Sequence, residues 1–161
     1  METISILTAP SGICTKRFTK DQDGAYVGLD QSIGYLVDHS SVQINSLSAL
    51  SELLLDLESS KHAYVIRGNL IEGRDQQAIR RTLKPRQGQE PFIEAASRSW
   101  CMIDIDDVPL PEELSDYKNN KTELVAYAVS KLPSQFQNVQ CWYQFSSNMG
   151  IKKDKIRLHL W

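Results

Sequence analysis

Residues 100–106 read Trp-Cys-Met-Ile-Asp-Ile-Asp, and apolar and acidic side chains alternate in the second half of this run. Successive side chains of a β-strand point to opposite faces of a sheet. The run therefore predicts a strand that turns Ile103 and Ile105 toward a core and Asp104 and Asp106 away from it. A core face and a candidate chemical face are thus predicted on the two sides of one strand.

A helix and two strands are predicted downstream of this run. Residues 122–131 carry apolar side chains at helical spacing, and residues 139–145 and 155–161 have strand-like patterns on either side of a turn at 146–150. The order β-α-β-β is the first two-thirds of a split βαβ sheet of the ferredoxin or RRM type, which continues with another helix and a fourth strand. Because the sequence ends on Trp161 within an apolar strand, we expect this sheet to be incomplete.

The preceding residues predict a separate, smaller α/β lobe, so the expected domains are 1–98 and 99–161 and the fold class is α/β, of the α+β kind. Ser46 is a suitable N-cap for a helix in which leucines recur on one face. Asp21 to Gly24 has the composition of a hairpin turn. The elements expected in this lobe are strands at 4–7, 14–19 and 62–67, helices at 47–57 and 75–83, and an exposed, basic loop at 84–89.

Composition limits the classes of protein that fit this chain. With 161 residues, of which 41% are hydrophobic and 24% charged, the sequence is that of a folded globular protein. The net charge of -2 offers no bulk attraction for nucleic acid, so any such partner must bind a local patch. The three widely spaced cysteines form no disulfide framework or zinc motif, and neither a secretory signal nor a membrane-spanning run is visible, which favours the cytoplasm.

The first and last predicted strands of the C-terminal sheet are expected to be neighbours, and their apolar faces fix their register. The opposite face then carries Asp104 and Asp106 beside Arg157 and His159. Two carboxylates on one face of a strand repel one another and are best tolerated where a divalent metal neutralises them. A neighbouring Arg and His suit the phosphates of a metal-bound nucleotide. Phosphoryl and nucleotidyl transfer require this combination of groups.

Each of these features also has a purely structural interpretation. The acidic pair can be the solvated face of an amphipathic strand, His159 a structural histidine, Arg157 a surface charge and the serines at 146–147 ordinary turn residues. The functional interpretation depends on all of them falling on one face. Two other classes therefore stay open: a non-catalytic module that binds nucleic acid or protein, and another metal-dependent enzyme such as a nuclease or a DxD glycosyltransferase.

Two segments have the pattern of known motifs. Met102–Asp106 (MIDID) resembles the first motif, hhhDhD with h hydrophobic, of the archaeo-eukaryotic primase superfamily. Residues 146–150 (SSNMG), followed by Arg157–Trp161 (RLHLW), resemble the second motif in the primase-polymerases of plasmids, phages and integrative elements, where a serine-rich turn precedes a strand with a nucleotide-binding histidine. Residues 15–18 and 23–24 are similar to the N-terminal lobe of such mobile-element proteins.

The resemblance implies a template-dependent nucleotidyltransferase that synthesises primers or extends DNA during replication of a mobile element. It implies that Asp104 and Asp106 bind catalytic Mg²⁺ or Mn²⁺. The partners would be a nucleic-acid template and nucleoside triphosphates. The residues expected to contact the incoming nucleotide are His159, Arg157, Lys155 and Ser147.

The sequence departs from the family pattern in two places. The third acidic motif has no counterpart, because the sequence ends two residues after His159. Arg157 stands where the family commonly has a small residue. We therefore expect the parent protein to be the enzyme and this chain to be an N-terminal part of it, which can be inactive alone. The missing elements are expected to leave apolar surface around Ile156 to Leu160 uncovered and to promote self-association.

Overall fold

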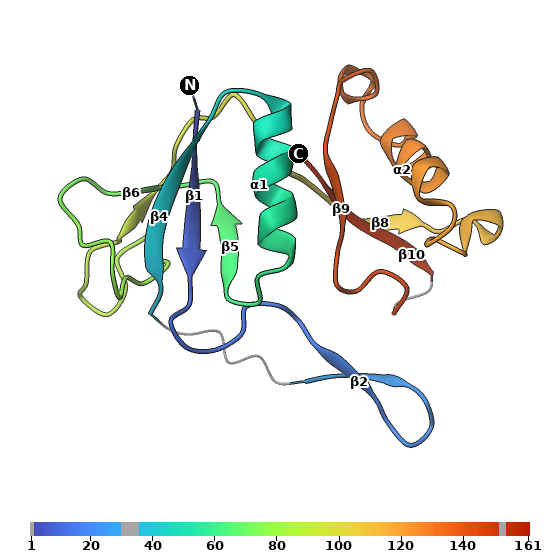
Figure 1. Ribbon diagram of the computed structural model, residues 1–161, viewed down its shortest axis with the longest axis horizontal. Coiled ribbons are helices and arrows are strands. Elements are labelled where there is room, and N and C mark those ends of the chain that lie inside the picture. Colours follow the sequence, from blue (N-terminus) through green and yellow to red (C-terminus); the bar gives the residue numbers. More distant parts are fainter. Residues whose placement is uncertain (1, 30–35, 152–153) are drawn as a thin grey trace. The chain divides into compact units, whose positions relative to one another are not determined.

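The structure, a computed structural model, describes residues 2–29, 36–151 and 154–161. These residues form a mixed α/β protein of two units, Met1–Ser99 and Trp100–Trp161, each with its own sheet and α-helix (Figure 1). Each unit also has its own cluster of buried apolar side chains. The predicted fold class, a mixture of helices and strands, is confirmed at this level.

A three-stranded antiparallel sheet organises the first unit. Its strands, in spatial order, are β4 (Asp38–Ile44), β1 (Glu2–Thr8) and β5 (Ala63–Ile66). The central strand β1 is buried on both faces, since Ile4 and Leu7 are both fully buried although they point to opposite sides. On one face Leu7 packs in a cluster with Ile79 and Ile93.

The helix predicted after Ser46 is confirmed as α1 (Leu47–Glu58), which lies beside this sheet (Figure 1). Ser46 caps it, because the Ser46 Oγ accepts a hydrogen bond from the Ala49 N–H at 3.1 Å. Leu50 and Leu54, one turn apart, are its buried residues. In the described part of the chain, no helix has both the length and the apolar character that a membrane span requires.

A hairpin of β2 (Phe18–Lys20) and β3 (Tyr26–Gly28) projects from the first unit (Figure 1). Its turn is confirmed: the Asp21 carboxylate accepts a hydrogen bond from the Asp23 N–H at 3.0 Å, and Gly24 has a positive φ of 80°. The first strand of the hairpin starts later than the sequence predicted, at Phe18.

The short helix predicted at 75–83 is wrong. These residues form no helix; Ile79 instead forms an isolated β-bridge with Val37. Ile79 is the one buried residue of the segment 75–83, so the segment packs through this side chain and not through an apolar helix face. The strand pair β6 (Asn69–Leu70) and β7 (Ile93–Glu94) lies on either side of it in the sequence. The remaining predictions for this unit, the strands at 4–7 and 62–67 and the exposed loop at 84–89, are confirmed.

The second unit is built around a central strand that comes last in the sequence. Its elements are β8 (Ile103–Pro109), the 3₁₀-helix η1 (Glu112–Leu114), α2 (Lys121–Ser130), the 3₁₀-helix η2 (Ser134–Phe136), β9 (Tyr143–Phe145) and β10 (Lys155–Leu160). β10 pairs antiparallel with β8 on one side and with β9 on the other. β9 starts later than predicted and β8 continues past Asp106.

The core of the second unit lies on one face of this sheet. Ile156, Leu158 and Leu160 are buried and alternate with more exposed side chains along β10. They pack in one cluster with Ile105 of β8 and Leu124 of α2. The expectation that the apolar face of β10 lacks cover is therefore wrong, because residues of this same unit bury it.

Candidate functional site

The polar face of the second sheet carries the predicted acidic pair and its basic neighbours. His159 lies directly opposite Asp104 in the register of β8 and β10, and the His159 Nε2 and Asp104 Oδ1 atoms are 3.5 Å apart. Next to them, the Arg157 Nη1 donates a hydrogen bond to the Asp106 Oδ1 at 2.9 Å. Strand alternation explains this arrangement. Asp104 and Asp106 face the same side because the core-facing Ile105 lies between them, and the core-facing Leu158 separates Arg157 from His159 in the same way. The structure thus brings these four predicted residues together.

A β-bulge adds a third carboxylate that the sequence analysis missed. β10 contributes the single residue Arg157 where β8 contributes both Asp106 and Asp107. Asp107 consequently reaches the polar side, where its Oδ1 accepts a hydrogen bond from the Lys155 Nζ at 2.6 Å. One feature of the sequence indicates this bulge. Val108 packs against the core, as Ile103 and Ile105 do, but its position is one residue out of phase with theirs.

Lys155 and Arg157 have different environments. The hydrogen bond and charge of Lys155 lower the pKa of the Asp107 carboxyl, and those of Asp107 raise the pKa of the Lys155 ammonium. Asp107 is exposed, so solvent screens this pair. The Arg157 side chain is only 11% exposed, and its buried Nε has no hydrogen-bond partner among the described residues. The Arg157 guanidinium is therefore largely buried beside the Asp106 carboxylate, whereas the Lys155–Asp107 pair lies in solvent.

Ser147, the remaining predicted nucleotide contact, is not joined to this row. It is exposed in the turn at 146–150, and no hydrogen bond among the described residues links its side chain to the charged groups. Its neighbour Ser146 fixes the turn: the Ser146 N–H donates to the Arg157 carbonyl at 3.0 Å, and the Ser146 Oγ accepts from the Asn148 N–H at 3.4 Å. The turn is therefore tied to the site through its backbone.

Tryptophans extend the polar face beyond His159. Trp161 follows His159 by two residues and so faces the same side, and its backbone exchanges two hydrogen bonds with Trp142, at 3.0 and 2.8 Å. The Trp161 ring contacts the Trp100 ring, with centroids 5.8 Å apart. Aromatic side chains next to basic groups are typical of surfaces on which nucleobases stack.

The acidic pair does not form a complete metal site by itself. Among the described residues, no group of three or more His, Cys, Asp or Glu side chains is arranged to hold a metal ion. The Asp104 and Asp106 side chains are 53% and 52% exposed, so both are open to a ligand. Mg²⁺ is commonly bound through one or two carboxylates together with substrate phosphates. The residues present therefore fit Mg²⁺ or Mn²⁺ that enters with a phosphate ligand.

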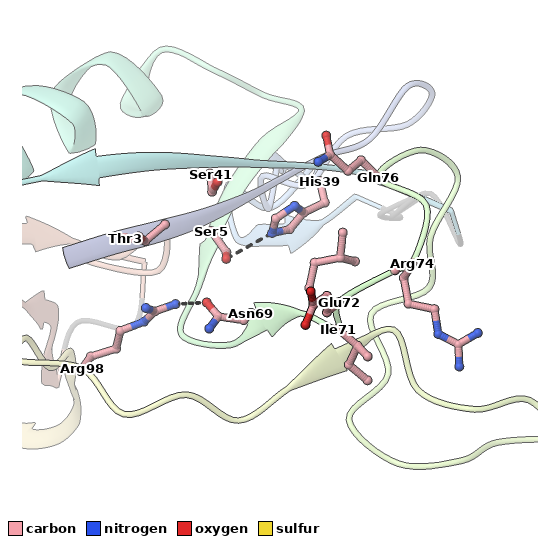
Figure 2. A pocket seen from close by; sticks show the side chains of 12 residues that line it. Thr3, Ser5, His39, Ser41, Asn69, Ile71, Glu72, Arg74, Gln76 and Arg98 are labelled. Carbon is pink, nitrogen blue, oxygen red and sulfur yellow. Dashed lines mark hydrogen bonds between the residues drawn. The ribbon is translucent and has the colours of Figure 1, made fainter. Parts of the chain in front are cut away.

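The first unit carries a separate polar hollow that the sequence analysis also missed (Figure 2). Its lining includes Ser5 of β1, His39 of β4 and Arg98, and its volume is about 350 Å³. The one sequence signal for it was the alternation of hydroxyl residues with Ile4 and Ile6 in β1. The other walls come from distant segments, which no local pattern connects.

Comparison of the chain with models of known protein families, with curated proteins and with solved structures finds no significant match. A function therefore has to be inferred from the chemistry and geometry of the site.

Proposed function

We propose that the polar face of the second unit binds a metal-bound nucleoside triphosphate and serves nucleotidyl transfer. The observation that carries this proposal is the row of two carboxylates and two basic groups on neighbouring strands, formed by Asp104, Asp106, Arg157 and His159. Nucleotidyl transfer depends mainly on positioning and charge neutralisation, and it needs both kinds of group close together.

The contacts of Arg157 and His159 with the two carboxylates indicate how this face responds to substrate. In the free protein Arg157 and His159 lie against the carboxylates. When bound, Mg²⁺ or Mn²⁺ would neutralise charge on the phosphate oxygens and polarise the reacting phosphoryl group. Asp104 and Asp106 then serve as metal ligands, while Arg157 and His159 donate their N–H groups to the phosphates. Lys155 adds positive charge beside them.

The topology supports the same proposal. β10 lies between β8 and β9, the two strands that α2 joins, and split βαβ sheets of the ferredoxin-like kind contain this order of strands. We therefore interpret the second unit as part of the catalytic module of a primase-polymerase of the mobile-element type, with the first unit as its N-terminal lobe. The parent enzyme copies a nucleic-acid template in the cytoplasm, and Trp161 offers a stacking surface for a base.

A second candidate function is a non-catalytic nucleic-acid-binding module. The observation that favours it is that Asp104 and Asp106 already have basic partners, while no complete metal-ligand group exists among the described residues. In such a module the tryptophans and the basic side chains bind a strand, and divalent metal has no effect on affinity.

Calorimetric titration of a nucleoside triphosphate into the 161-residue chain, with Mn²⁺ and with a chelator, distinguishes the two functions. We expect Mn²⁺ to tighten binding by about tenfold or more, which corresponds to about 1.4 kcal/mol per factor of ten. The double substitution Asp104→Ala with Asp106→Ala should abolish this metal-dependent gain. It should leave the fold intact, because both side chains lie off the core.

The matched control is Glu112→Gln with Glu113→Gln, which removes two exposed negative charges from the same unit and should change nothing. His159→Ala should weaken nucleotide binding with and without metal. If the affinity is the same in chelator and in the double Asp variant, nucleotidyl transfer is excluded as the role of this face and the binding module takes its place.

A further inference from the structure

The polar hollow of the first unit has the size and lining of a second ligand site (Figure 2). It lies between the face of β1 and β4 that carries Thr3, Ser5 and Ser41 and the segment 69–76, with Arg98 at one end. Its volume of about 350 Å³ falls within the range of about 300–1,000 Å³ that small-molecule sites occupy. The hollow can therefore take a small organic ligand rather than only a single ion.

Arg98 is fixed in place without being neutralised. Its Nε donates to the Arg67 carbonyl at 3.4 Å, and its Nη2 donates to the Asn69 side-chain oxygen (Figure 2). None of the ion pairs within 4.0 Å among the described residues includes Arg98, and its Nη1 has no partner among them. An anchored, half-buried guanidinium with unused donors is suited to an anion with several oxygens.

The opposite wall offers hydroxyl groups and an imidazole. The His39 Nε2 and Ser5 Oγ are 3.1 Å apart, and burial lowers the pKa of His39, which favours the uncharged ring. The buried Nδ1 of His39 has no partner among the described residues. Thr3 and Ser41 add hydroxyls on the same face, and Glu72 adds an acceptor. The Thr3 and Ser41 hydroxyls and the Glu72 carboxylate match the hydroxyls of a sugar-like body.

The Ser5–His39 pair is not a catalytic dyad. Ser5 is 1% exposed, so its hydroxyl cannot reach an incoming carbonyl or phosphoryl group. No carboxylate orients the His39 ring, because the Nδ1 atom is unpartnered within the described ranges. The hollow therefore has the features of a binding site.

We propose that this hollow binds a phosphate monoester carried on a small hydroxyl-bearing body, such as ribose 5-phosphate or a nucleoside monophosphate. Arg98 binds the phosphate, and the Thr3 and Ser41 hydroxyls with the Glu72 carboxylate bind the sugar. The same chemistry occurs in a free nucleotide and at the 5′-phosphorylated end of a strand. The site uses no residue of the second unit, so it stands independently of the metal role of Asp104 and Asp106.

Calorimetric titrations of the 161-residue chain in the presence of chelator test this site. The probes are ribose 5-phosphate, adenosine monophosphate, adenosine, and one short oligonucleotide with and without a 5′-phosphate. We expect each phosphorylated form to bind at least about tenfold more tightly than its unphosphorylated counterpart, because the charge-assisted hydrogen bonds to Arg98 are lost without the phosphate. If only the phosphorylated oligonucleotide binds, the ligand is a strand end and the proposal still holds.

Arg98→Gln should weaken the binding of the phosphorylated probes at least about tenfold. Arg86→Gln, the same charge change in the exposed loop of this unit, should have no effect. Arg98→Lys keeps the charge and should bind with intermediate affinity, and thermal melts show that each variant is folded. The double Asp variant should bind these probes normally. No binding of any phosphorylated probe, or wild-type affinity in folded Arg98→Gln or Arg98→Lys, would contradict the proposal.

Discussion

Arg157 belongs to the polar face of β10, whereas the residues on either side of it in the sequence belong to the core. Its neighbours Ile156 and Leu158 are fully buried, while Arg157 itself pairs with Asp106 at 2.9 Å. Folding has therefore already restricted the rotamers of this long side chain, so the side chain loses less conformational entropy when a ligand binds its guanidinium. The same reasoning applies to the anchored Arg98 of the first unit.

Gly150 tests whether the turn beside Arg157 is built as described. Its φ is 77°, and an added Cβ would collide with the Tyr117 ring. We expect Gly150→Ala to destabilise the second unit by about 1–3 kcal/mol. Urea unfolding followed by tryptophan fluorescence measures this, because all three tryptophans lie in that unit.

The control for this substitution is Gly24→Ala, a glycine of similar φ in the first unit with nothing within 4 Å of an added Cβ. It should leave the tryptophan transition unchanged. A transition in Gly150→Ala that matches the wild-type one would be incompatible with the packing of Tyr117 on this glycine.

His39 should make the stability of the first unit depend on pH. Burial lowers its pKa from 6.5, so the unfolded chain binds this proton more readily than the folded one. The free energy of unfolding should therefore fall as pH drops below about 6.5, until the folded-state pKa is passed. His39→Asn should reduce this slope. Amide hydrogen exchange of β1 at about pH 7.5 and 5.5 measures it, and an equal slope in both proteins would disprove the assignment to His39.

At the level of single elements, β8 shows what alternation predicts and where it fails. The sequence pattern correctly placed Ile105 in the core and Asp104 and Asp106 opposite it. It could not place Asp107, because the bulge depends on pairing with β10, a strand distant in the sequence. The error at 75–83 has the same origin, since Ile79 pairs in an isolated β-bridge with Val37, a residue distant in the sequence.

The helix at 47–57 and the turn at 21–24 were predicted accurately because their signals are local. The cap at Ser46 and the turn at 21–24 are determined by side chains within a few residues of the backbone groups they bind. The hollow around Arg98 could not be predicted, because β1, β4 and the segment 69–76 meet only in the folded unit.

The bulge makes a prediction about deletions in β8. Removing Asp107 brings Val108 into phase with Ile103 and Ile105, so the core face is preserved and only the exposed pair with Lys155 is lost. We expect this variant to stay folded, with a small change in melting temperature. Removing Ile105 instead shifts the acidic residues toward the core and should prevent folding of the second unit. Circular dichroism melts decide between these outcomes, and equal damage by both deletions would contradict the bulge.

At the scale of the whole molecule, each unit has a buried cluster of its own among the described residues, which predicts separate responses to core mutations. Leu158 is fully buried in the cluster of the second unit, and Leu158→Ala should cost about 2–5 kcal/mol. The tryptophan transition should move to much lower urea, while hydrogen-exchange protection of β1 in the first unit is retained. Leu55→Ala, at a side chain that is 49% exposed, is the control and should move neither signal. Loss of β1 protection in Leu158→Ala would show that the units fold as one.

Paramagnetic broadening by Mn²⁺ in nuclear magnetic resonance spectra tests most directly whether the polar face is a metal–nucleotide site. In the presence of a nucleoside triphosphate, we predict broadening of the amide signals of Asp104, Asp106 and His159. This broadening should be much weaker with Mn²⁺ alone, because the two carboxylates need the phosphate oxygens to complete the coordination shell. It should disappear in the Asp104→Ala, Asp106→Ala variant. Sharp signals at Asp104 and His159 with both ligands present, or broadening there that survives the double substitution, would contradict the proposed function.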